Sequence, residues 1–71
     1  MDPRTQFGRN LRAARARLGL SQTEVGARAR LHRTEVSLLE RGERDPRLST
    51  IVRVAVALDV PPAALLEGTG G

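Results

Sequence analysis

The apolar residues of this chain recur every three or four positions in five separate runs. Positions three and four apart share one face of a helix, so the pattern predicts five short amphipathic helices and no strand. The first run places four residues on the inner face: Phe7, Leu11, Ala14 and Leu18. The fourth run places five there: Leu48, Ile51, Val54, Ala55 and Leu58. We therefore predict an all-α fold with an aliphatic core.

Capping residues set the limits of the first two helices. We expect the first helix to begin after Pro3 and to end at Gly19, because glycine readily adopts the left-handed conformation of a helix end. The second helix begins at Ser21-Gln22-Thr23-Glu24, a capping box in which the serine hydroxyl and the glutamate carboxylate each accept a hydrogen bond from a free backbone N–H. Val25 and Ala29 form its inner face.

The third helix has an unusual outer face. We expect His32 to be its N-cap, Glu35 to reach back to an exposed N–H, and Gly42 to end it. Val36 and Leu39 fall together on the side that meets the core. The opposite side carries Arg33, Thr34, Ser37, Leu38 and Arg41. A solvated face usually mixes glutamate and lysine, so this set indicates a surface that contacts a partner.

The end of the chain completes one domain. Pro61-Pro62 opens a last short helix that carries Leu65 and Leu66, since proline is favoured at the first helical positions. We predict a single domain over residues 1–67 and a flexible glycine-rich tail over residues 68–71.

The charge of the chain points to an anionic partner. The formal net charge is +4, and all 12 basic residues are arginines. A GC-rich genome explains the preference for arginine over lysine, but it does not explain the net charge. Because a guanidinium binds phosphate or guanine through two parallel hydrogen bonds, we expect a polyanion.

Several functional classes are disfavoured by composition. The chain has no cysteine, which excludes disulfides and thiolate zinc sites, and it has one histidine and no glycine-rich phosphate loop. We therefore expect no enzyme activity, no metal and no cofactor. The sequence has no run long enough to span a membrane and nothing like a signal peptide, so we expect a cytoplasmic, nucleoid-associated protein.

Over about residues 7–66 the sequence resembles the lambda-repressor/Cro-like helix-turn-helix family. The resemblance is carried by Leu20-Ser21-Gln22, Val25, Ala29, Leu31, Val36, Leu39-Glu40-Arg41-Gly42, Pro46 and residues 48–60. It implies a compact five-helix domain in which the second and third helices form the helix-turn-helix. It also implies a transcriptional regulator, a repressor or controller protein, that binds double-stranded DNA.

The resemblance implies that four residues of the third helix contact bases in the major groove: Arg33, Thr34, Ser37 and Leu38. Their chemistry agrees, because arginine pairs with guanine O6 and N7, hydroxyls bond to base edges or phosphates, and leucine packs on a thymine methyl.

The resemblance also implies contacts to the DNA backbone or the minor groove from Gln22, His32, Arg41, Arg44 and Arg47. Arg47 is the candidate for the minor groove. Two of these residues have structural alternatives: the amide of Gln22 can buttress the third helix, and His32 can serve only as a cap. For Glu35, repulsion from phosphates favours the capping role.

One ion pair and two departures from the family pattern concern the structure. Arg15 and Glu40 match a partly buried pair that joins the first and third helices. Arg30 stands in the turn where the family commonly has glycine, so it must tolerate a left-handed backbone or a reshaped turn. Gly26 replaces the usual alanine and is expected to loosen the second helix.

A single domain of this size reads few base pairs, so we predict a homodimer on a near-palindromic operator. We assign the dimer surface to Val60, Pro61, Leu65 and Leu66, which offer more apolar area than so small a domain readily buries. The alternative is an antitoxin-like or bridging protein that uses the same fold to hold another protein.

Overall fold

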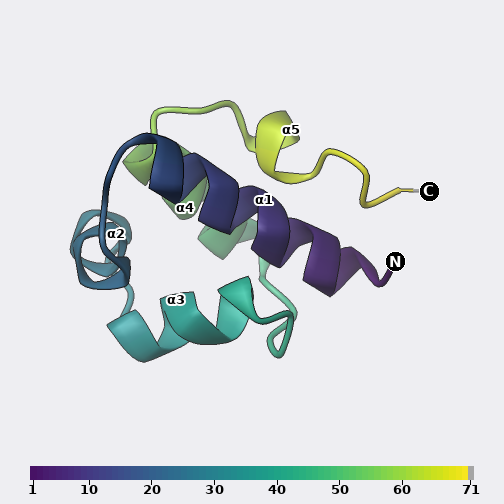
Figure 1. The fold of residues 1–71 in the computed structure, drawn as a ribbon, viewed down its shortest axis with the longest axis horizontal. Coiled ribbons are helices and arrows are strands. Elements are labelled where there is room, and N and C mark those ends of the chain that lie inside the picture. Colours follow the sequence, from purple (N-terminus) through teal and green to yellow (C-terminus); the bar gives the residue numbers. More distant parts are fainter. Residues whose placement is uncertain (71) are drawn as a thin grey trace.

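The computed structural model describes residues 1–70, which form five helices and no strand. The helices are α1 (Pro3–Arg17), α2 (Gln22–Ala29), α3 (Arg33–Glu40), α4 (Leu48–Ala57) and α5 (Pro62–Leu65). α2 packs against α3 and α4, α1 against α3 and α5, and α4 against α5. In Figure 1, α3 forms the lower edge of the molecule, α5 the upper edge, and α4 lies behind α1. The predicted all-α, five-helix fold is confirmed.

One core of aliphatic side chains and Phe7 holds the five helices together. Phe7 and Leu11 of α1, Val36 and Leu39 of α3, and Leu58 after α4 are at most 2% exposed. Burying a side chain of this size contributes about 1.5–3 kcal/mol to the stability of the fold. Because α3 is anchored from behind by its two core residues, its opposite face is fixed in orientation.

Side chains cap the helix starts. Asp2 Oδ1 accepts from Arg4 N at 2.8 Å, so α1 begins at Pro3 itself. Ser21 N donates to Glu24 Oε1 at 2.8 Å, and Glu24 N donates to Ser21 Oγ at 3.0 Å, which confirms the capping box. The hydrogen bond from Ser21 N lowers the pKa of Glu24 below its ordinary value.

The pattern of apolar positions misassigns two leucines. Leu18 is 49% exposed because α1 ends at Arg17, and Leu48 is 76% exposed because it is the first residue of α4, at the edge of the buried stripe. The prediction that these two residues face the core is wrong.

Two glycines allow backbones to come close. A Cβ on Gly8, in the middle of α1, would lie 2.5 Å from Leu39 O and 2.6 Å from Glu40 O, so glycine is required where α1 crosses the end of α3. A Cβ on Gly26 would lie 2.5 Å from Leu31 O. Glycine at position 26 therefore allows the turn after α2 to pack closely against that helix.

The end of the chain is tied back to α1. Asn10 Nδ2 donates to Leu65 O at 2.9 Å and to Glu67 O at 2.8 Å, and Gln6 Nε2 donates to Asn10 Oδ1 at 3.0 Å. Beyond α5, Thr69 N donates to Leu66 O at 3.0 Å in a turn. The flexibility predicted for residues 68–71 stays a prediction, and Gly71 lies outside the described residues.

Candidate nucleic-acid interface

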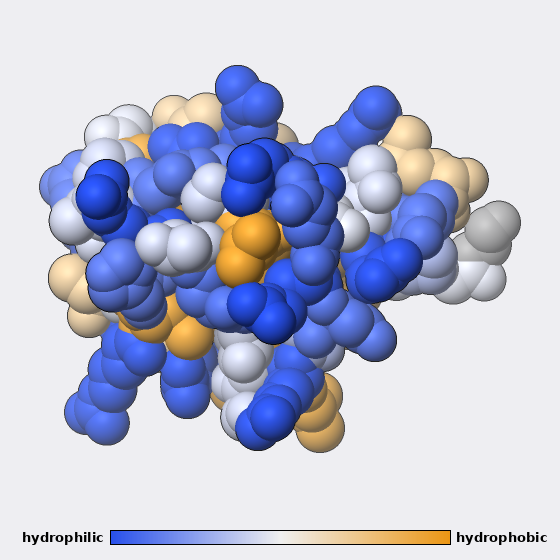
Figure 2. Space-filling view, turned by 90° about the horizontal axis from the view of Figure 1, so that it is seen from below, coloured by the Kyte–Doolittle hydropathy of each residue, from blue (hydrophilic) through white to orange (hydrophobic). Residues whose placement is uncertain are grey.

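The outer face of α3 is open to solvent. Arg33 and Thr34 are exposed, Ser37 and Leu38 are half-buried, and the core residue Val36 is fully buried behind them. Figure 2 shows this side of the molecule as mostly hydrophilic with a small hydrophobic area near its centre. An α-helix with such a face fits the width of the major groove of B-DNA.

A shallow hollow joins this face to the start of α2. Its lining residues are Arg15, Ser21, Gln22, Thr23, Arg33, Thr34 and Ser37. Within residues 1–70, Arg33 forms no ion pair, so its guanidinium is available to a ligand. The hydroxyls of Ser21 and Thr23 were not assigned a site role from the sequence. The signal for them is the position of two hydroxyl residues at the start of α2, the helix that precedes α3.

Arg15, which lines this hollow, forms an ion pair that joins α1 to α3. Arg15 Nε lies 2.5 Å from Glu40 Oε2, and Arg15 Nη2 lies 2.9 Å from Glu40 Oε1, with side chains 18% and 5% exposed. The hydrogen bond to Glu40 raises the pKa of Arg15 above its ordinary value. Arg15 Nη1 also donates to Leu20 O at 2.9 Å. The predicted structural pair is confirmed.

Gln22 belongs to the same network. Its Nε2 donates to Glu40 Oε1 at 3.1 Å, so the amide links α2 to the end of α3. This is the buttressing role considered as an alternative to phosphate contact, which stays a prediction. Because Glu40 is held by Arg15 and Gln22 together, three helices share one carboxylate.

The turn between α2 and α3 depends on a left-handed arginine. Arg30 has φ 60° and ψ 45°, as its position in place of glycine requires. Arg53 of α4 supports the turn from behind, since its Nε donates to Ala29 O at 3.0 Å and its Nη2 to Arg30 O at 3.3 Å. Arg53 was not predicted to have this role.

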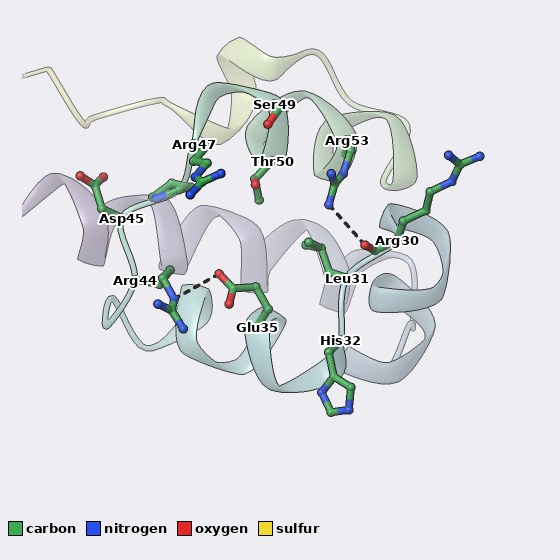
Figure 3. Close-up of a pocket in the computed structure, with 11 residues that line it drawn as sticks. Arg30, Leu31, His32, Glu35, Arg44, Asp45, Arg47, Ser49, Thr50 and Arg53 are labelled. Atoms are coloured by element: carbon green, nitrogen blue, oxygen red, sulfur yellow. Dashed lines mark hydrogen bonds and ion pairs between the residues drawn. The ribbon is translucent and has the colours of Figure 1, made fainter.

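A second hollow lies between α3 and the start of α4 (Figure 3). Arg44, Arg47, Ser49 and Thr50 line it from the loop and from α4, and Glu35 from α3. The close-up shows Arg47 at the α4 side of the hollow and Arg44 beside Glu35. Arg44 and Arg47 are both exposed, and their contact with DNA stays a prediction.

Glu35 does not cap α3. Its Oε2 lies 3.2 Å from Arg44 Nε, and the cap is made by His32 alone, whose Nδ1 accepts from Thr34 N at 3.0 Å. The expectation that Glu35 reaches back to a backbone N–H is wrong, because the following loop brings a cation to it. The N-cap role of His32 is confirmed, and its contact with DNA stays a prediction.

The ion pair between Arg41 and Glu43, at the edge of the interface, is exposed. Arg41 Nε lies 3.4 Å from Glu43 Oε2, and both side chains are more than half exposed. An exposed pair of this kind contributes about 0–1 kcal/mol, so an anion can compete for Arg41 at little cost. The pair of Arg44 with Glu35 is less exposed, because the Glu35 side chain is 29% exposed.

The structure reduces the set of residues that can form the predicted dimer surface. Leu65 is 1% exposed and belongs to the core of one chain, so its assignment to an interface is wrong. Leu66 is 40% exposed, Pro61 is exposed and Val60 is half-buried. These three residues stay candidates.

Other site chemistries are not represented in the described part of the chain. Among residues 1–70, no group of three or more His, Cys, Asp or Glu side chains is placed to hold a metal ion. None of the five helices described has the length and hydropathy that a membrane span requires.

Comparison with known proteins gives consistent matches. Residues 11–65 match the helix-turn-helix family. The chain is 39% identical over 69 residues to an uncharacterized HTH-type transcriptional regulator, y4dJ, of Sinorhizobium fredii, covering 97% of this chain and 90% of that protein.

The chain is also similar to solved structures. The restriction-modification controller protein C.AhdI from Aeromonas hydrophila is 39% identical, with a TM-score of 0.86 over 87% of this chain and 94% of that one. The DNA-binding domain of the P22 C2 repressor is 29% identical, with a TM-score of 0.83 over 87% of this chain and 82% of that one.

Proposed function

Because the chain belongs to the helix-turn-helix family, we propose that it is a sequence-specific regulator of transcription that binds a near-palindromic operator in double-stranded DNA as a homodimer. The family and fold predicted from the sequence are confirmed by the matches to a regulator, a controller protein and a phage repressor. On this proposal the protein works in the cytoplasm, at the nucleoid.

The observation that carries the proposal is the free face of α3. Arg33 is exposed and without an ion pair in residues 1–70, and Thr34 is exposed beside it on the first turn of the helix. Arg33 is therefore assigned to a guanine through O6 and N7, and Leu38 to a thymine methyl. Thr34 and Ser37 are assigned to base edges within reach of the same helix.

The surrounding cations are assigned to the phosphates. Gln22 and the hydroxyls of the first hollow lie at the start of α2, and Arg41 and Arg44 lie beyond the end of α3. Arg47 is assigned to the minor groove. Contacts on both sides of α3 fix the register of a helix on the duplex, while the base contacts of α3 provide sequence preference.

Dimerisation supplies the remaining specificity. Two copies related by a two-fold axis place their α3 helices in successive major grooves, about 34 Å apart. Such a dimer binds a near-palindromic site, because each half-site presents the same bases to an identical surface. We propose repression or control of a restriction-modification system as the biological setting, by analogy with the controller and the repressor to which the chain is similar.

Selection of bound fragments from a random DNA pool tests the proposal directly. We expect enrichment of one near-palindromic sequence whose half-sites are separated by about one helical turn. Binding to that sequence should weaken log-linearly with salt, with a slope that reflects several phosphate contacts.

The same experiment distinguishes the proposed function from the alternative, a protein that holds another protein. An antitoxin-like or bridging protein whose role is to hold another protein through an apolar interface would enrich no sequence, and its binding would respond little to salt. Arg33→Ala is the matched control, since it should relax the base preference at one position of the enriched half-site while leaving salt-dependent binding to random duplex. Failure of the wild-type chain to enrich any sequence would contradict the proposal.

A further inference from the structure

A carboxylate lies among the arginines of the second hollow. Glu35 belongs to α3, and the cations that line the same hollow come from the turn before α3, from the loop after it and from α4: Arg30, Arg44, Arg47 and Arg53. In Figure 3 the Glu35 side chain points into the hollow, toward Arg44, while Asp45 lies at its far edge. Glu35 therefore places a negative charge where cations gather beside α3.

The partner of this carboxylate is Arg44. Arg44 Nε lies 3.2 Å from Glu35 Oε2, so the ion pair joins α3 to the loop that follows it. The Glu35 side chain is 29% exposed and that of Arg44 is 51% exposed. The guanidinium is thus accessible to a large anion from the solvent side while it is bound to Glu35 from the other side.

The fold does not account for the charge of Glu35. A partly exposed ion pair adds little to stability, because solvent screens it and two long side chains must be ordered. The N-cap of α3 is made by His32, whose Nδ1 accepts from Thr34 N at 3.0 Å, so Glu35 is not needed for capping. Near a duplex the carboxylate repels the phosphates. The charge therefore opposes DNA binding and contributes little to the fold, which points to a role in setting the affinity for DNA.

We propose that Glu35 competes with DNA phosphate for the guanidinium of Arg44, and that this internal contact limits the affinity of the protein for DNA of any sequence. The inference rests on the proposed function, because it takes Arg44 to be a phosphate contact. It adds an autoinhibitory contact to the binding surface, in which Arg44 exchanges Glu35 for a phosphate when the duplex binds.

The exchange should be visible in the salt dependence of binding. A side chain that neutralises a phosphate releases about 0.9 of a counterion from B-form DNA, so each such contact steepens the dependence on salt. Here the release is offset, because Glu35 loses its partner and attracts a cation from solution. Removing the carboxylate should therefore strengthen binding and steepen the salt dependence together. Both effects should require Arg44, which distinguishes the exchange from a general repulsion between Glu35 and the duplex.

Fluorescence anisotropy with a random duplex, at several salt concentrations, tests the inference on the full chain. We expect Glu35→Gln to lower the dissociation constant by about three- to tenfold and to steepen the log–log salt slope by up to about one. Glutamine keeps the size of the side chain and is a good helix former, so urea denaturation should report an unchanged stability. A gain in affinity cannot result from a damaged fold.

A double-mutant cycle with Arg44→Ala makes the test specific to the ion pair. In the Arg44→Ala chain, the gain from Glu35→Gln should fall to about twofold or less, because no guanidinium is left to release. Glu43→Gln is the matched control: it removes the same charge from the neighbouring pair with Arg41, and its effect should not depend on Arg44. A gain from Glu35→Gln that persists undiminished without Arg44, or no gain at all, would overturn the inference.

Use of a random duplex distinguishes this inference from the proposed function. If the wild-type chain enriches an operator and Glu35→Gln changes nothing, the function stands and the inference is overturned. If no operator is enriched but Glu35→Gln strengthens binding to random duplex in an Arg44-dependent manner, the inference stands and sequence-specific regulation is contradicted. Absence of duplex binding by both the wild-type chain and Glu35→Gln would overturn both.

Discussion

Arg15 and Glu40 join the first and third helices through two hydrogen bonds, of 2.5 and 2.9 Å, to a carboxylate that is 5% exposed. The pair fixes the end of α3 against α1, and Gln22 attaches α2 to the same group. The orientation of α3 therefore depends on residues that lie outside its exposed face.

Arg15→Ala should destabilise the fold strongly. Removing the guanidinium leaves Glu40 buried with one amide partner, at a cost of about 3–5 kcal/mol. Urea denaturation measures the change, with Arg12→Ala as control because Arg12 is an exposed residue of the same helix. A loss no larger than that of the control would show that the pair is not needed for the fold.

Arg33→Ala and Arg44→Ala should affect DNA binding differently. Loss of Arg33 should cost about 1–3 kcal/mol on the selected operator and relax the base preference at one position. Loss of Arg44 should weaken binding to all sequences alike and reduce the salt slope by about one phosphate contact. Fluorescence anisotropy on operator and random duplex measures both. Identical behaviour of the two variants would refute the separation of base and phosphate contacts.

Acid should remove the contribution of the α2 capping box. The pKa of Glu24 is lowered in the folded chain by the hydrogen bond from Ser21 N, so the ionised group stabilises the fold above its unfolded pKa, and this contribution is lost as pH falls through the folded value. Glu24→Gln keeps a capping side chain without the charge. The stability gap between wild type and variant should shrink as pH falls below the ordinary glutamate value of 4.5, and a constant gap would contradict the assignment.

Arg30→Gly should stabilise the protein by about 1 kcal/mol, because a non-glycine residue with φ 60° is strained and glycine is not. The carbonyl that accepts from Arg53 is retained. Arg28→Gly is the matched control: it removes the same side chain from the last turn of α2 and should destabilise by about 1 kcal/mol. Thermal unfolding of the two variants should shift in opposite directions.

Gly8→Ala should destabilise the protein although alanine is the better helix former. Its Cβ would lie 2.5 Å from Leu39 O, so α1 and α3 must separate, at about 1–3 kcal/mol. Ala13→Gly, at an exposed position of α1, measures the helix propensity alone. If both substitutions follow propensity, Gly8 has no packing role.

The helices were predictable because their apolar spacing, their caps and their breaking residues agree with one another. Val36 and Leu39 face the core for this reason, and the opposite side of α3 follows from them. Leu18 and Leu48 were misassigned because periodicity does not reveal where a helix ends relative to the core.

Contacts between helices were harder to predict from the sequence. The ability of Glu35 to cap a helix can be read from the local sequence. Its ion pair with Arg44 cannot, because it depends on the path of the loop that follows α3. Arg53 carries no local signal for its bonds to the α2 carbonyls, and Leu65 is apolar in the same way whether it meets its own core or another chain. The Arg15–Glu40 pair was anticipated only through family resemblance.

The bonds from Arg53 also have a dynamic consequence. Ala29 and Arg30 end α2, yet their carbonyls are held by a side chain 24 and 23 positions further along the sequence. Opening of α4 therefore releases the turn that sets the angle of α3. We expect backbone amides at the end of α2 and within α4 to exchange with deuterium as one cooperative unit. The orientation of α3 would then be lost in a single step rather than by gradual fraying.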